Sequence, residues 1–176
     1  MTRILVMGDT HCRAWEEVHP SIRKLIPDAD IVVHCGDLTN IAIAKGLKKE
    51  ARQAIIVHGN SDPPDITAAL PKQEVLKIQG KTIAITHPYW GGPPFDPAII
   101  LNDFDEPIDI VLSGHTHDPM NEERDGVLYL NPGQAYRSFL TDATVGFLNI
   151  NDGKVSSQIH VIENWRDRYP GEQQFQ

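Results

Sequence analysis

Long apolar runs are missing from this sequence. At its start only four apolar residues, Ile4 to Met7, precede Gly8, which is shorter than the apolar region of a secretory signal peptide. No run elsewhere in the chain approaches the ~18 apolar residues that a membrane-spanning helix needs. We therefore expect no contact with a membrane and a cytoplasmic location.

Cysteine is scarce as well. Cys12 and Cys35 are the two cysteines of the chain, and they form no CxxC pair. A disulfide framework needs more cysteines than this, and a thiolate zinc site needs them at closer spacing. Both kinds of site are disfavoured, so we expect two small thiols that are buried or lie in loops.

Basic residues are few. Lysine and arginine total 16 against 24 acidic residues, so the formal net charge is −8. A protein that follows nucleic-acid phosphates usually carries a basic stripe, and this sequence has none. The balance argues against long DNA or RNA as a partner and favours a small phosphorylated molecule. It leaves a homo-oligomer possible.

What the chain does have is the composition of one globular domain, with 40% apolar and 23% charged residues in 176. The first sixty residues alternate between short apolar runs and stretches with helical spacing, which is typical of βαβαβ. Strands are predicted at residues 3–8, 30–35 and 54–58, and helices at 15–26 and 41–52. Crossovers of this length connect parallel strands.

The second half of the chain is predicted to be more antiparallel, because its strands are joined by short turns. Prolines and glycines interrupt residues 88–97, which are expected to lack regular structure. The domain is expected to span residues 1–162, followed by a polar C-terminal tail at 163–176. The predicted strands are residues 74–78, 82–86, 109–113, 127–130, 143–150 and 154–162, with a short helix at 98–103.

Five segments share one design, in which an apolar strand ends and side chains with lone pairs follow at once. Sites in open α/β sheets form at the carboxyl ends of strands, and residues two apart in extended chain project to the same side. Together the five segments predict a metal site. They are Gly8-Asp9-Thr10-His11, Gly36-Asp37, Gly59-Asn60-Ser61-Asp62, Thr86-His87 and Gly114-His115-Thr116-His117.

These segments resemble the pattern of the calcineurin-like metallophosphoesterase superfamily, which is D-x-H, G-D, G-N, a later histidine and G-H-x-H. The segment Asn131-Pro132-Gly133 is similar to one in the small prokaryotic phosphodiesterase branch. The resemblance covers about residues 1–162. It implies an α/β fold, a two-sheet β-sandwich flanked by helices in a four-layer α/β/β/α arrangement.

The resemblance also implies a centre with two divalent metal ions. One ion would be held by Asp9, His11, Asp37 and His117, and the other by Asp37, Asn60, His87 and His115, with Asp37 as the bridge. Carboxylate, imidazole and amide ligands suit manganese, our first choice, and also nickel, zinc, iron or cobalt.

The implied activity is hydrolysis of a phosphoester, with a phosphodiester as the first choice and a phosphomonoester as the alternative. Hydroxide bound to the two ions would attack phosphorus. The residues expected to carry the catalysis are Asp9, Asp37, Asn60 and His115.

Other positions near the motifs are candidates for supporting roles. Larger relatives place a histidine directly after the asparagine of G-N, whereas this chain has Ser61, which leaves the proton donor to the leaving group open. Thr10 and Asp62 could support ligands from behind. Candidate substrate contacts are Arg13, Tyr89, Trp90 and Arg137.

Two alternatives come from other classes of protein. One superfamily relative, a subunit of the retromer sorting coat, keeps this fold as a scaffold, so a non-catalytic metal-bound interaction module is possible. The amidohydrolases also use an HxH pair, but on the first strand of a barrel of about 250 residues. Here the pair lies two-thirds along a shorter chain, which excludes that fold.

Overall fold

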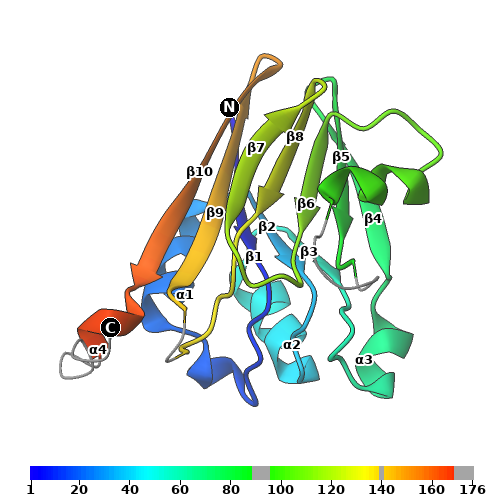
Figure 1. The fold of residues 1–176 in the computed structure, drawn as a ribbon. Coiled ribbons are helices and arrows are strands. Elements are labelled where there is room, and N and C mark those ends of the chain that lie inside the picture. Colours follow the sequence, from blue (N-terminus) through cyan, green and yellow to red (C-terminus); the bar gives the residue numbers. More distant parts are fainter. Residues whose placement is uncertain (89–95, 139–140, 169–176) are drawn as a thin grey trace.

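The computed structural model describes residues 1–88, 96–138 and 141–168 and contains two five-stranded sheets. The first has the order β10-β9-β1-β2-β3 and the second the order β4-β5-β6-β8-β7 (Figure 1). The strands are β1 (Thr2–Met7), β2 (Ile31–Cys35), β3 (Ala54–Val57), β4 (Gln73–Ile78), β5 (Lys81–Thr86), β6 (Ile110–Ser113), β7 (Met120–Arg124), β8 (Val127–Asn131), β9 (Ala143–Asn151) and β10 (Lys154–Glu163).

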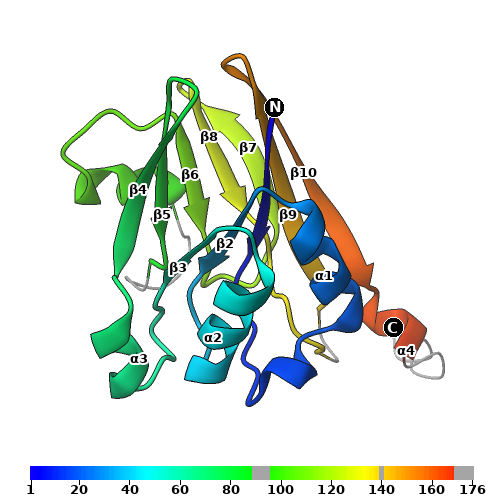
Figure 2. The same ribbon diagram turned by 180° about the vertical axis from the view of Figure 1, so that it is seen from behind.

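Short helices flank the sheets. They are α1 (Pro20–Leu25), α2 (Ile41–Glu50), α3 (Pro64–Ala69) and α4 (Trp165–Arg168), with 3₁₀ helices at Trp15–Glu17, Ile26–Asp28 and Pro97–Asp103. Seen from behind, α1 and α2 cover the outer face of the first sheet (Figure 2). No helix within the described ranges is long and apolar enough to cross a membrane.

The predicted four-layer sandwich is confirmed by three clusters of buried apolar side chains. Leu5 and Met7 of β1 pack toward the helices, whereas Ile4 and Val6 pack toward the second sheet. A strand buried on both faces explains why its sequence is a continuous apolar run. On the far side of the second sheet, Ile100 of a 3₁₀ helix packs on Tyr129 and its neighbours.

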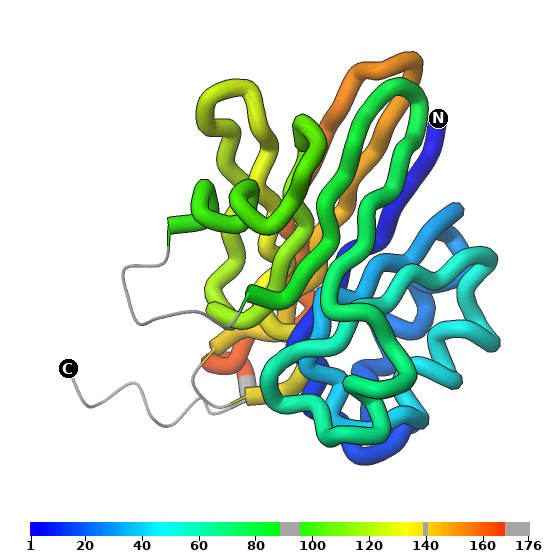
Figure 3. The backbone as a smooth tube through the Cα atoms, turned by 90° about the vertical axis from the view of Figure 1, so that its right-hand side faces the viewer, coloured from blue at the N-terminus to red at the C-terminus, as the bar shows by residue number. Residues whose placement is uncertain are grey.

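Hydrogen bonds between the turns of two β-hairpins connect the two sheets at the end opposite the polar loops. Gln79, in the turn between β4 and β5, donates from Nε2 to the Ile150 carbonyl oxygen, and Asp152 N donates to Gln79 Oε1. Figure 3 shows these hairpins, in green and orange, side by side. The carboxyl ends of β1, β2, β3, β5 and β6 consequently gather at the other end of the sandwich.

Some predicted elements differ from the structure. The helix predicted at 15–26 is broken, because Pro20 begins a new helix with His19 as its N-cap. Pro64 likewise begins α3, which is not among the predicted helices. The strand β7 was missed because its sequence, MNEER, is polar and exposed, as suits an edge strand. Finally, α4 lies within the predicted tail.

Candidate metal centre

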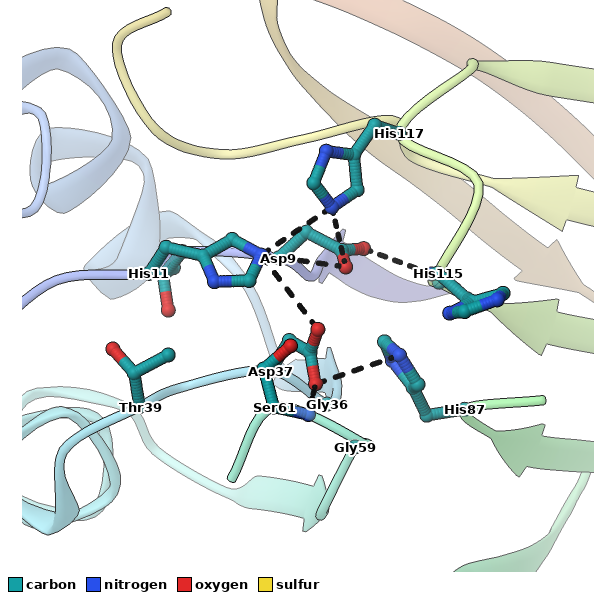
Figure 4. A network of polar contacts seen from close by, with 12 residues as sticks. Asp9, His11, Gly36, Asp37, Thr39, Gly59, Ser61, His87, His115 and His117 are labelled. Carbon is teal, nitrogen blue, oxygen red and sulfur yellow. Dashed lines mark hydrogen bonds and ion pairs between the residues drawn. The ribbon is translucent and has the colours of Figure 1, made fainter. Parts of the chain in front are cut away.

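Polar side chains from both sheets converge where the strands end, and Figure 4 shows the carboxylates and imidazoles facing one another. The first sheet contributes the carboxylates and the amide, and the second sheet contributes three of the four imidazoles. Following β1, β2 and β3 are Asp9 with His11, Asp37 and Asn60; following β5 and β6 are His87, His115 and His117.

Asp9, His11, Asp37 and His117 form what we call the first cluster, in which one ligand atom from each residue lies within 4.8 Å of the others. His11 Nε2 lies 3.3 Å from His117 Nε2 and 3.6 Å from Asp37 Oδ2. His117 Nε2 lies 3.2 Å from Asp9 Oδ1. Four potential donors to a metal therefore point at one small volume.

The buried carboxylate of Asp9 makes this volume favourable for a cation. Its side chain is fully buried, and Oδ2 accepts a hydrogen bond from the His115 backbone N–H at 3.0 Å. Oδ1 has no hydrogen-bond partner among the residues that the structure describes. A buried carboxylate oxygen without a donor is costly unless a cation neutralises it.

Asp37, Asn60, His87 and His115 form what we call the second cluster. His87 Nδ1 lies 2.7 Å from the Cys35 carbonyl oxygen, so Nδ1 carries the proton and donates to it. In the neutral imidazole, Nε2 then carries a lone pair, and it lies 2.9 Å from Asn60 Oδ1 and 3.5 Å from Asp37 Oδ1. His87 Nε2 and these two oxygens thus face one another with no proton between them, which a cation would resolve.

Asp37 belongs to both clusters. Its Oδ2 faces His11 of the first cluster, and its Oδ1 faces His87 of the second. The same Oδ1 accepts a hydrogen bond from the Ser61 backbone N–H at 2.8 Å. One carboxylate thus presents a separate oxygen to each side, the arrangement that a bridging ligand requires.

The backbone at the centre is strained. Five of the seven candidate ligands have positive φ, between 43° and 85°: Asp9, His11, Asp37, His115 and His117. Positive φ costs a residue with a side chain of order 1–3 kcal/mol, and such residues concentrate at functional sites. The surrounding fold therefore holds these ligands in place against their local preference.

Two glycines allow the carboxylates to pack closely. A Cβ at Gly114 would lie 2.7 Å from Asp9 Oδ2 and 2.9 Å from the Cys35 carbonyl oxygen. A Cβ at Gly59 would collide with the Asp37 carboxylate. The glycines before Asn60 and His115 are thus required by close approach.

Asp62 supports the second cluster from behind. Its buried carboxylate accepts hydrogen bonds from the backbone N–H groups of Asp37, Thr39 and Gly59, at 3.1, 2.7 and 2.7 Å. These bonds tie the loop after β2 to the loop after β3. The orienting role considered for Asp62 therefore has a geometric basis.

Thr10 lies behind the first cluster in the same way. Its Oγ1 is 3.1 Å from His34 Nε2, and His34 Nδ1 accepts from the Gly36 backbone N–H at 3.2 Å, so Nε2–H donates to Thr10. Both side chains are fully buried, and burial lowers the pKa of His34 to about 4. His34 is a neutral support and not a ligand.

Burial also acts on the candidate ligands. It lowers the pKa of His11 and of His115, which leaves their lone pairs available at neutral pH. His117 differs, because the Asp9 carboxylate, 3.2 Å from its Nε2, raises its pKa. A cation bound at the first cluster would compete with a proton for this nitrogen.

Comparison with known proteins agrees with these motifs. The sequence profile of the calcineurin-like phosphoesterase superfamily domain matches residues 2–153, which includes every candidate ligand. The chain belongs to this superfamily.

Relatives within the superfamily are named as phosphoesterases. A probable metallophosphoesterase of Methanocaldococcus jannaschii is 33% identical over 131 residues, which are 73% of this chain and 65% of that relative. The chain thus spans slightly less than two thirds of that protein. The phosphodiesterase YfcE of Escherichia coli K12 is 28% identical over 136 residues, 68% of this chain and 69% of the relative.

Solved structures share the fold. A Thermotoga maritima protein solved by NMR has a TM-score of 0.73 at 29% identity, covering 92% of this chain and 100% of its own. Wild-type Vps29 from Entamoeba histolytica, solved with zinc, has a TM-score of 0.71 at 27% identity, covering 92% and 99%. The superfamily fold therefore occurs with a metal bound in at least one of these structures.

The structure describes two of the four residues predicted to contact the substrate, Arg13 and Arg137. Arg137 is exposed, and its Nε donates to Glu163 Oε2 at 3.0 Å beside His19. Arg13 is exposed, and its backbone N–H donates a hydrogen bond to Glu17 Oε2. Tyr89 and Trp90 lie outside the described residues.

Tyr136 is a neighbour of the centre that the sequence did not reveal. Its ring packs edge-on against His11 and His117, with centroid distances of 5.2 and 5.9 Å. Burial and the nearby Asp9 charge raise the pKa of its phenol, so it stays protonated. The only sequence signal was its position three residues after Gly133, in a segment already singled out.

Among the residues that the structure describes, cavities adjoin the centre at two opposite ends. One, of about 210 Å³, is lined by His11 of the first cluster together with Tyr136 and Arg137. The other, of about 300 Å³, is lined by His115 of the second cluster. Figure 4 shows His11 and His115 on opposite sides of the carboxylates.

Proposed function

We propose that this chain is a phosphodiesterase that holds two divalent metal ions, one at each cluster. The observation that carries the proposal is Asp37, whose two carboxylate oxygens lie 3.6 Å from His11 Nε2 and 3.5 Å from His87 Nε2. A single metal site would need only one of these oxygens. The unpartnered Asp9 Oδ1 and the converging acceptors of the second cluster support the same conclusion.

When bound, a pair of divalent ions supplies an activated water and neutralises charge on the phosphoryl oxygens. The donor set of carboxylate, amide and imidazole suits manganese, nickel, zinc, iron or cobalt. The chain's own contribution is to position these donors in advance. Asp62, Gly59 and Gly114 hold the carboxylates, and the Cys35 carbonyl oxygen selects the tautomer of His87.

Ser61 limits what the chain can do for the leaving group. The side chain directly after Asn60 is a hydroxyl, whose Oγ accepts from Asn60 Nδ2 at 3.4 Å. A serine hydroxyl is a much weaker acid than an imidazolium. We therefore expect substrates whose leaving groups depart without strong protonation, such as aryl esters, to react fastest.

A diester fits the surroundings of the centre better than a monoester. A phosphodiester carries two substituents on phosphorus, and cavities adjoin the centre at both His11 and His115. A phosphomonoester would leave one of these cavities without a substituent. The 28% identity to a protein named as a phosphodiesterase supports the same choice.

The test compares hydrolysis of bis-p-nitrophenyl phosphate with that of p-nitrophenyl phosphate. Metal-stripped protein is resupplied with Mn²⁺, Ni²⁺, Zn²⁺ or Mg²⁺, and metal content is measured in parallel. We expect metal-dependent turnover that favours the diester and two ions per chain. Preference for the monoester would make the protein a phosphomonoesterase instead. Two bound ions without any turnover would indicate a metal-bound interaction module.

A further inference from the structure

The cavity beside His115 has a chemical character of its own. We propose that it receives one substituent of the phosphodiester and selects a mainly apolar substituent that is cationic or uncharged over an anionic one. The inference rests on the proposed function, because it places the phosphate at the two clusters.

The position of the cavity is what links it to the centre. Its wall includes Gly114, His115 and Thr116, the segment that follows β6. His115 Nδ1 lies 2.9 Å from Asn60 Oδ1, so the same side chain borders both the second cluster and the cavity. A substituent on a phosphate at the second cluster is therefore within reach of this space.

The size and apolar lining of the cavity favour a small substituent. Its volume of about 300 Å³ lies at the lower end of the range for small-molecule sites. Ile100, Met120, Pro97 and Pro119 supply apolar surface. Apolar groups of a substituent would lose contact with water here, which is favourable.

The charged residues of the lining are all acidic. They are Asp96, Asp118 and Glu122. One nearby cation offsets part of this charge, because Arg124 Nη2 donates to Glu122 Oε2 at 2.6 Å and Nη1 lies 3.7 Å from Asp96 Oδ1. Three carboxylates against one guanidinium leave a negative wall that would repel a second phosphate or a carboxylate.

The opposite cavity carries less negative charge. Around His11 its lining combines Arg137 with Glu17, and Arg137 also pairs with Glu163. The two ends of the centre thus differ in charge, and the acidic end is the one that can discriminate by charge.

The experiment uses a matched set of p-nitrophenyl phosphodiesters that differ in one substituent. Choline supplies a cation, 3,3-dimethylbutanol is its neutral isostere, and 4-hydroxybutanoate supplies an anion of similar length. For the metal-loaded protein we expect kcat/KM to fall in that order. Each carboxylate should account for about two- to fivefold, the range measured for exposed ion pairs.

The variants Asp118→Asn and Glu122→Gln remove charge from the cavity wall. Each should reduce the preference for choline over dimethylbutanol. The matched control is Glu123→Gln, next to Glu122 on β7, because Glu123 lines a different cavity beside Lys81 and Asp109. It should leave the preference unchanged.

A binding measurement separates this inference from the proposed activity. Calorimetric titration of the metal-loaded protein with phosphocholine and with 3,3-dimethylbutyl phosphate should give the same order of affinity, whether or not turnover occurs. Equal affinities for the cationic and the neutral ligand, together with equal kcat/KM values for the cationic and anionic substituents, would overturn the cavity proposal alone. Loss of all hydrolysis with the affinity order retained would overturn the phosphodiesterase proposal alone.

Discussion

The two clusters differ in charge although they share a ligand. The first combines two carboxylates with two imidazoles, and the second combines the shared Asp37 carboxylate with an amide and two imidazoles. Affinity for a divalent cation rises with the number of charged ligands. The two proposed sites therefore differ in affinity for a divalent cation, and the first cluster should bind its ion before the second.

The two clusters also rest on different supports. Behind the first lie Thr10 and the neutral His34, whereas behind the second a carboxylate, Asp62, accepts three backbone N–H groups. The first support contributes mainly to folding, and the second directly orients Asp37 and Gly59. Substitutions can test each difference separately.

The largest effect should come from the residue that both clusters share. Asp37→Asn keeps the shape of the side chain but removes its charge, so we expect activity to fall at least about a thousandfold, beyond the 10–100-fold usual for outer partners of a ligand. Metal analysis should show that both ions bind more weakly. Asp28→Asn, at an exposed aspartate, is the control. Loss of one ion only would contradict the bridging role.

His34 should make stability depend on pH. Its pKa is lowered to about 4 in the folded protein, against about 6.5 when unfolded. The unfolded chain therefore binds more protons between these values, and the free energy of unfolding should fall by about 3 kcal/mol as pH drops from 7 to 4. Urea unfolding of metal-free protein measures this.

The control for this pH dependence is His34→Gln, compared with His160→Gln at an exposed position on β10. The change with pH should shrink in the first variant and persist in the second. Equal pH dependence in both variants would show that His34 is not responsible.

Asp62→Asn should loosen the second cluster more than the first. Its carboxylate bonds to Asp37 N and Gly59 N would weaken, and loss of such a support typically costs about 10–100-fold in metal affinity or activity. Titration against a metal-sensitive dye should show the weaker ion displaced further. An equal loss at both sites would mean that Asp62 acts only on Asp37.

The smallest change should come from removing the charge difference itself. Asn60→Asp gives the second cluster a second carboxylate, and we expect its affinity to rise about tenfold. Asp9→Asn should lower the affinity of the first. Metal titration should give two dissociation constants in the wild type, one for each cluster, and more similar values in Asn60→Asp. Constants that do not change would contradict the proposed effect of ligand charge.

Much of the site could be predicted because its signals are local. Asp9, Asp37 and Asn60 follow apolar runs that were easily read as strands, and glycine precedes each of them. The superfamily pattern linked these segments to the histidines farther along the chain. By contrast, the position of Tyr136 near Gly133 did not reveal its contact with His11, because the two residues come from distant segments.

Every strand except β7, the order of the ligand segments and the membership of the superfamily could be predicted from the sequence alone, since apolar periodicity and short motifs are properties of neighbouring residues. Tertiary structure decided which oxygen of Asp37 faces which histidine, which nitrogen of His87 is free, and that one end of the centre is acidic. Those features depend on two sheets that meet only after folding. Contacts between residues far apart in sequence are not encoded in any single stretch of it.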